Sequence, residues 1–329
     1  MIRAFPLGLL LALLVACAPG TLPPGDPDIS PRLTATAFLA SDGTALPLRR
    51  WEPAGQPKAL VLALHGFNDY SSFFHTTAEA LADQGILSMA YDQRGFGANE
   101  DVGYWAGVAG YTRDMREAIA AARQTYPELP LFVLGESMGG AVALVTLSAP
   151  NAPAVDGVIL SAPAVWARKT WPFYQRWALW LGAHSLPWLP VSGRGLNIKP
   201  SDNIEMLRAL GRDPLIIKDT RIGTIWGLAN LMDSALEAVP RFDRKALILY
   251  GSKDEIIPGK PFDRLVATLP DDARLRQTLA LYDGGWHMLL RDLNADLVHA
   301  DIAAWIEDAT QPLPSAADMR ARLRLRRPY

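Results

Sequence analysis

The stretch Leu131-Phe132-Val133-Leu134-Gly135-Glu136-Ser137-Met138-Gly139-Gly140 decides the fold of this chain. Its apolar start predicts a buried strand, and the small and apolar residues 139–147 predict a helix. Between them lies a Gly-x-Ser-x-Gly turn. Glycines two residues before and two residues after the serine relieve the close approach of the chain at such a turn. A strand, a sharp turn and a helix form a nucleophile elbow, so the sequence predicts that Ser137 is a nucleophile.

A serine that attacks a carbonyl needs hydrogen-bond donors for the oxyanion that develops. Residues 59–64 form an apolar run that predicts another buried strand, and His65, Gly66 and Phe67 follow it. We expect the backbone N–H groups of Phe67 and Met138 to be the two oxyanion donors. Because His65 precedes the serine in the chain, we expect it to hold this loop by hydrogen bonds and not to act as the base.

The general base is expected on a loop after the last strand. His287 stands there, in a glycine-containing loop at residues 283–287. His75 precedes the serine, His184 falls in a segment where packing or surface exposure is expected, and His299 falls within the final helix, where we expect it to be solvated. The sequence therefore selects His287.

The acid that orients the base is expected after the preceding strand, residues 246–250. Asp254 lies on the loop that follows this strand and is our choice. Glu255 and Asp283 are the alternatives.

Strands alternate with helices along most of the chain, which favours a parallel sheet with helices on both faces. Residues 34–39 and 45–51 predict an N-terminal hairpin. The core is assigned to residues 34–162 and 241–310. Its further strands are expected at residues 86–91, 155–160 and 277–281, and its helices at residues 74–83, 111–126 and 293–307.

Residues 163–240 interrupt this alternation and contain six of the ten tryptophans. We interpret them as a helical cap inserted over the carboxyl ends of the strands, because long insertions are usually functional. Aromatic rings with one polar edge suit an acyl channel or a membrane interface. The alternative is that they only pack the cap onto the core. The six are Trp166, Trp171, Trp177, Trp180, Trp188 and Trp226.

The N-terminus has the pattern of a bacterial lipoprotein signal. Arg3 precedes an apolar run that is too short to span a bilayer, and Leu14-Val15-Ala16-Cys17 resembles a lipobox. Residues 1–16 are interpreted as the signal peptide, and residues 17–33 as the lipidated Cys17 and a proline-rich tether. The alternative is an ordinary signal peptide with an incidental cysteine. Ala18 after Cys17 favours the periplasmic face of the outer membrane.

Composition excludes some partners. The 32 Lys and Arg residues nearly balance 34 Asp and Glu residues, which gives no reason to expect nucleic acid. Cys17 is the only cysteine, so no disulfide is expected within the chain. The tail at residues 311–329 carries five arginines within its last eleven residues. We expect it to be solvated, with attraction to anionic lipid as the alternative.

With these residues in place, the chain resembles the monoacylglycerol lipase and lysophospholipase group of α/β-hydrolases. The resemblance implies the α/β-hydrolase fold and hydrolysis of single-chain lipid esters without metal or cofactor. The chain departs from the group at Glu136, where a histidine is frequent, and at the bulky Phe67. The resemblance runs over residues 45–306 and rests on His65-Gly66, residues 91–97, residues 135–140, Asp213-Pro214-Leu215, Gly251-Ser252-Lys253-Asp254 and Gly285-Trp286-His287.

The sequence thus predicts a serine carboxylester hydrolase that is anchored in the bacterial cell envelope and acts on monoacylglycerol or lysophospholipid. Two alternatives stay open. One is a thioesterase or an aminopeptidase-like hydrolase with the same triad, and the other is a catalytically silent lipoprotein that binds acyl chains. The oligomeric state is left open.

Overall fold

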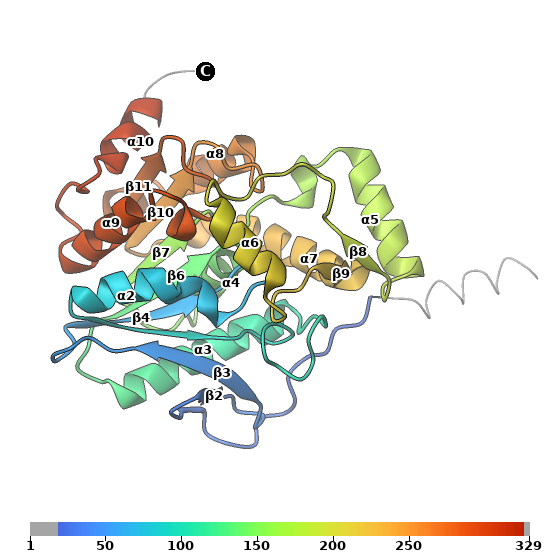
Figure 1. Cartoon of the computed structure of the whole chain (residues 1–329), viewed down its shortest axis with the longest axis horizontal. Coiled ribbons are helices and arrows are strands. Elements are labelled where there is room, and N and C mark those ends of the chain that lie inside the picture. Colours follow the sequence, from blue (N-terminus) through green and yellow to red (C-terminus); the bar gives the residue numbers. More distant parts are fainter. Residues whose placement is uncertain (1–18, 326–329) are drawn as a thin grey trace, which may run out of the picture.

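The computed structural model describes residues 19–325 and has a nine-stranded sheet at its centre (Figure 1). Six neighbouring strands run parallel, and an antiparallel group of three continues the sheet at one edge. The mostly parallel sheet that the sequence predicts is confirmed. Its order is β1 (Arg32–Leu33), β2 (Ala37–Leu39), β3 (Ala45–Trp51), β5 (Ile86–Tyr91), β4 (Ala59–Leu64), β6 (Leu131–Glu136), β7 (Gly157–Ser161), β10 (Ala246–Gly251) and β11 (Gln277–Tyr282).

Helices cover both faces of this sheet, which is why its central strands are buried at every position rather than at every second one. All six residues of β4, β6 and β10 are buried. One face is covered by α3 (Val108–Thr125), α4 (Met138–Leu147) and α8 (Gly259–Thr268), and the other by α2 (His75–Asp83) and α9 (Ala295–Glu307). Short 3₁₀ segments lie at Ser71–Phe74, Arg168–Thr170, Val239–Arg241, Ala273–Arg276 and Leu289–Arg291.

The insertion follows β7 and contains α5 (Phe173–Ser185), β8 (Pro190–Ser192), α6 (Ile204–Arg212), β9 (Asp219–Arg221) and α7 (Ile222–Ala238). The sequence predicts helices here, and the structure adds a two-stranded antiparallel sheet of β8 and β9. Three residues per strand are too few to produce a recognisable pattern. Helix α7 packs against both α5 and α4, so it joins the insertion to the body. Within residues 19–325, no helix is long and apolar enough to cross a membrane.

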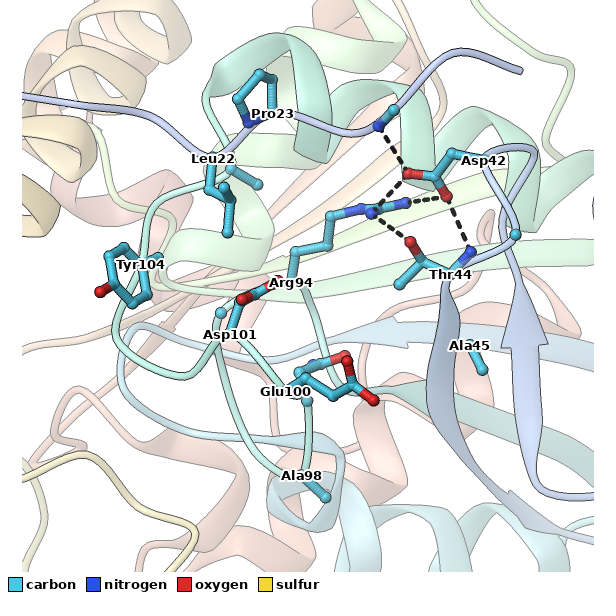
Figure 2. A pocket seen from close by; sticks show the side chains of 15 residues that line it. Leu22, Pro23, Asp42, Thr44, Ala45, Arg94, Ala98, Glu100, Asp101 and Tyr104 are labelled. Atoms are coloured by element: carbon cyan, nitrogen blue, oxygen red, sulfur yellow. Dashed lines mark hydrogen bonds and ion pairs between the residues drawn. The ribbon is translucent and has the colours of Figure 1, made fainter. Parts of the chain in front are cut away.

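The N-terminal segment contains no helix or strand between residues 19 and 31, but it is packed against the body. The Leu22 N–H donates to the Trp105 carbonyl at 2.8 Å, and the Gly25 N–H donates to Asp42 at 3.0 Å. Figure 2 shows this segment along a cavity of about 750 Å³, on whose wall Arg94 is bonded to Asp42. Residues 19–31 of the predicted tether are therefore packed against the body, and we call this segment the strap.

The C-terminal tail differs from the sequence prediction of a solvated run. Residues 317–325 form helix α10 (Ala317–Leu325), which packs along the edge strand β11. Ala317 and Ala321 are buried, and Nε of Arg320 donates to the Leu281 carbonyl at 3.1 Å. Ala317 and Ala321, which are spaced four apart, form the face of α10 that packs on the body. The sequence prediction followed the arginines, which dominate the composition of this helix.

Candidate active site

Ser137 stands at the turn between β6 and α4 in a strained backbone conformation. Its φ is 51° and its ψ is −110°, a region that residues other than glycine rarely adopt. Its N–H donates to the Ser161 carbonyl at 2.9 Å, and its own carbonyl accepts from the N–H groups of Ala141 at 3.0 Å and Ala164 at 2.9 Å. Bonds to the first turn of α4 and to residues 161–164, at the end of β7 and just after it, thus hold the strained turn in place.

The glycines on either side of Ser137 are required by close backbone contacts. A Cβ at Gly135 would lie 2.5 Å from the carbonyl carbon of Gly139. A Cβ at Gly139 would overlap the carbonyl oxygen of Leu64, and the Gly139 N–H donates to the His65 carbonyl at 3.1 Å. The turn is therefore pressed against the end of β4, from which the next loop emerges.

The structure brings Asp254 and His287 together across the loops that follow β10 and β11. Nδ1 of His287 lies 2.8 Å from Oδ2 of Asp254, and both side chains are almost fully enclosed. The other carboxylate oxygen of Asp254 accepts from the N–H groups of Ile256 and Ile257 at 2.8 Å each. Since these loops and the Ser137 turn all leave the carboxyl ends of parallel strands, the three side chains belong to one edge of the sheet.

Neither alternative acid contacts the histidine. Glu255 accepts from the Lys199 N–H at 2.7 Å, and Asp283 is largely exposed with Arg320 4.0 Å away. The loop position alone could not separate adjacent residues such as Asp254 and Glu255, because the direction of each side chain depends on the turn.

The loop after β4 lies directly beside the serine. A Cβ at Gly66 would be 3.4 Å from Cβ of Ser137. Asn68 has a φ of 65°, which turns the chain back after Phe67. In residues 19–325, the N–H groups of Phe67 and Met138 donate to no protein acceptor. Both are free to donate to another group, as the predicted oxyanion donors must be.

His65 holds this loop, as the sequence predicts. Nε2 of His65 accepts from the Gln93 N–H at 2.9 Å, and Nδ1 lies 2.8 Å from the Gly66 carbonyl. Burial lowers the pKa of His65, so the ring is neutral and Nδ1–H is the donor to Gly66.

His299 contradicts the sequence prediction of a solvated residue. It is buried, with Nε2 3.0 Å from Oγ1 of Thr77 and 3.0 Å from the Leu290 carbonyl, and burial lowers its pKa. It lies on the face of α9 that packs against α2. His184 stacks on Trp180 with ring centroids 4.6 Å apart, which agrees with a packing role.

The insertion is bonded to the oxyanion loop, a relationship that the sequence does not reveal. The Tyr70 hydroxyl donates to Asp213 at 2.7 Å, Nδ2 of Asn68 donates to Oγ1 of Thr220 at 2.7 Å, and the Ile217 N–H donates to the Asn68 carbonyl at 3.0 Å. Ser137, Asp254 and His287 are all buried.

A buried cluster of charged side chains includes Glu136, the residue before Ser137, and the sequence indicated no role for its other two members, Arg291 and Asp69. Arg291 is buried between Asp69 and Glu136. Its only signal in the sequence is its place four residues after His287. In the part of the chain that the structure describes, no group of three or more His, Cys, Asp or Glu side chains could hold a metal ion.

A mostly parallel sheet, a serine at a strained strand-to-helix turn and an Asp–His pair on later loops define the α/β-hydrolase class. The chain belongs to the family described as Serine aminopeptidase, S33 (Hydrolase_4), which matches residues 55–294. It is a serine hydrolase.

Relatives with assigned names agree with this class. The chain is 28% identical to human monoglyceride lipase over 291 residues, which cover 85% of this chain and 92% of that protein. It is 26% identical to a monoacylglycerol lipase of Mycolicibacterium smegmatis, over 82% of this chain and 95% of the relative. A soluble variant of Saccharomyces cerevisiae monoglyceride lipase shares the fold with a TM-score of 0.68 and 20% identity, over 88% of this chain and 98% of the yeast chain.

Proposed function

We propose that this chain is a lipase for monoacylglycerol and related single-chain esters such as lysophospholipid. The observation that carries the proposal is the 2.8 Å contact of His287 with Asp254 at the sheet edge that presents Ser137. The substrate class is supported by the names of the human and mycobacterial relatives. The exposed aromatic residues of α5 are consistent with substrates that come from a lipid phase.

The proposed reaction follows from the roles of these groups. His287 takes the proton of Ser137 Oγ as this oxygen attacks the ester carbonyl, and the N–H groups of Phe67 and Met138 receive the oxyanion. Asp254 holds Nδ1–H of the imidazole and stabilises the imidazolium. His287 then gives the proton to the departing glycerol oxygen. In the second half His287 takes a proton from a water whose oxygen attacks the acyl carbonyl, and it returns that proton to Ser137 Oγ as the fatty acid leaves.

We further propose that the chain is lipid-anchored through Cys17 in the bacterial cell envelope, at the periplasmic face of the outer membrane. Cys17 lies outside the described residues, two positions before Pro19. In Figure 1 the N-terminal segment begins on the side of the molecule where α5, β8 and β9 are drawn, whereas α10 lies toward the other end of the long axis. This arrangement favours membrane contact through the anchor and α5 over contact through the basic tail.

Fluorophosphonate labelling and a substrate panel test the proposal. Wild type is expected to be labelled and to hydrolyse long-chain monoacylglycerol, whereas Ser137→Ala should lose labelling and several orders of magnitude in kcat. Labelling of Ser137→Ala would place the nucleophile elsewhere. An unlabelled wild type would favour the silent acyl-binding alternative.

The family description favours an aminopeptidase-like activity as the second candidate. A thioesterase with the same triad is the other alternative that the sequence leaves open. Competition of peptide amides and acyl thioesters with monoacylglycerol separates these activities. A larger kcat/KM for the amide or the thioester would overturn the lipase proposal. Mass spectrometry of the mature N-terminus tests the anchor, and an unmodified Cys17 would refute it.

A further inference from the structure

One guanidinium joins the three chain segments that carry the proposed reacting groups. Glu136 directly precedes Ser137, Asp69 follows Phe67 by two residues, and Arg291 follows His287 by four. Nη2 of Arg291 lies 2.7 Å from Oε1 of Glu136 and 2.8 Å from Oδ2 of Asp69. A single nitrogen thus ties the nucleophile turn, the oxyanion loop and the histidine loop together.

The three charges are buried, which makes this link stiff. Each side chain is at most 7% exposed. Charge-assisted hydrogen bonds are strong where water is excluded, and removing one partner would leave a buried charge without compensation. The ring of Phe73 lies 5.8 Å from the guanidinium carbon and closes another side of the cluster.

The charge balance of the cluster depends on Arg291. Burial raises the pKa of Glu136, and the Arg291 guanidinium opposes this rise. Burial would lower the pKa of Arg291, but the two carboxylates outweigh it and raise that pKa, so the guanidinium stays charged. The cluster is linked to the nucleophile turn through Glu136, the residue before Ser137.

We propose that Arg291 is a positioning residue, which holds the oxyanion loop and the histidine loop in register with Ser137 through its shared bonds to Asp69 and Glu136. This inference rests on the proposed function of Ser137, His287 and Phe67. The inference adds that the nucleophile turn, the oxyanion loop and the histidine loop do not hold their relative positions without the Arg291 guanidinium. Small displacements of reacting groups are costly, since a misplacement of about 1 Å can lower a rate by about 10²-fold.

The decisive variant removes the link without leaving a buried charge. Arg291→Met combined with Glu136→Gln and Asp69→Asn keeps the side-chain volumes close to those of wild type and neutralises all three groups. We expect this triple variant to melt near the wild-type temperature. For a soluble short-chain ester we expect kcat to fall by about 10²-fold with little change in KM, and fluorophosphonate labelling to slow in parallel.

Two further variants complete the test. Arg291→Lys keeps the charge on a single, more flexible group, so its kcat should lie between those of wild type and the triple variant. Arg94 is a matched control because it also bridges two carboxylates, Asp114 at 2.7 Å and Asp42 at 2.9 Å. It differs from Arg291 in that it lines the cavity beside the strap (Figure 2). Arg94→Met should lower the melting temperature and leave kcat unchanged.

A folded triple variant with wild-type kcat would overturn the positioning role, because the cluster would then serve stability alone. If the triple variant does not fold, Arg291→Lys decides by the same criterion: a reduced kcat at unchanged KM and melting temperature supports the role, and a wild-type kcat overturns it. A wild type that is neither labelled nor active would overturn the proposed function itself. The two failures are therefore distinguishable.

Discussion

Oδ2 of Asp254 contacts Nδ1 of His287 at 2.8 Å, while Oδ1 of the same carboxylate accepts two backbone hydrogen bonds from the loop that carries it. The backbone bonds fix the plane of the carboxylate that faces His287. Such an acid holds the imidazole in one tautomer and leaves Nε2 free to receive a proton. Glu255 next to it is instead bonded to the Lys199 N–H.

We therefore predict that Asp254→Asn lowers kcat by about 10⁴-fold, because an amide favours the wrong tautomer of His287. Glu255→Gln is the matched control and should leave kcat near that of wild type. Ester turnover and circular dichroism on both variants check this. Equal losses in the two variants, or a larger loss in Glu255→Gln, would show that the acid is misassigned.

A second prediction concerns the nucleophile turn. Gly139→Ala forces a Cβ against the Leu64 carbonyl, and we expect a loss of stability of about 1–3 kcal/mol together with a lower kcat. Gly182→Ala in α5 is the control, because its Cβ would meet only the side chain of Ile222, at 3.3 Å. Alanine favours a helix over glycine, so this control should not melt earlier than wild type. A Gly139→Ala protein with wild-type stability and kcat would contradict the strained-turn account.

The sequence predicts those features that are determined by residues close to one another in the chain. The apolar run before Gly135, the serine turn and the small residues after it lie within a few positions of each other, and the structure has the expected strand and helix there. The order of acid and base along the chain likewise narrows the choice to loops that follow particular strands.

Features that depend on contacts between residues far apart in the sequence could not be predicted. His299 is buried because α9 meets α2, and Thr77 is 222 positions away in the chain. Helix α10 packs on an edge strand that its own composition does not reveal. Arg291 acquires its partners Asp69 and Glu136 only when three loops meet, so no spacing in the sequence could identify it.

A third prediction concerns substrate selection by the exposed aromatic residues of the insertion. Trp177 and Trp188 are 65% and 56% exposed, whereas Trp171 is half-buried and donates to the Trp166 carbonyl at 2.9 Å. We expect Trp177→Ala with Trp188→Ala to lower kcat/KM for long-chain monoacylglycerol by about tenfold, comparable to roughly two methylene groups withdrawn from apolar contact. An acetyl ester should be affected far less.

The ratio of these two losses is the quantity to measure, since partial unfolding would depress both. Leu275→Ala is the control, because Leu275 is an exposed apolar residue outside the insertion. Equal losses for both esters at an unchanged melting temperature would mean that the tryptophans do not select the substrate.

The last prediction follows from the buried His299. Burial lowers its pKa below the ordinary value of about 6.5, and the nearest carboxylate, Asp296, is exposed and 3.9 Å away. As the pH falls below about 6.5, the unfolded chain binds a proton that folded His299 does not. Its contribution to stability is therefore complete above this pH and is lost as the pH falls toward the folded pKa, by at most about 1.4 kcal/mol per pH unit.

His299→Gln removes this titration and keeps a donor for the Leu290 carbonyl, while the other histidines stay the same in both proteins. The difference in unfolding free energy between wild type and His299→Gln, measured by urea denaturation from pH 8 to pH 5, should shift in favour of the variant as the pH falls. A difference that is constant over this range would mean that His299 takes up its proton equally well in the folded protein, which its enclosure between α2 and α9 argues against.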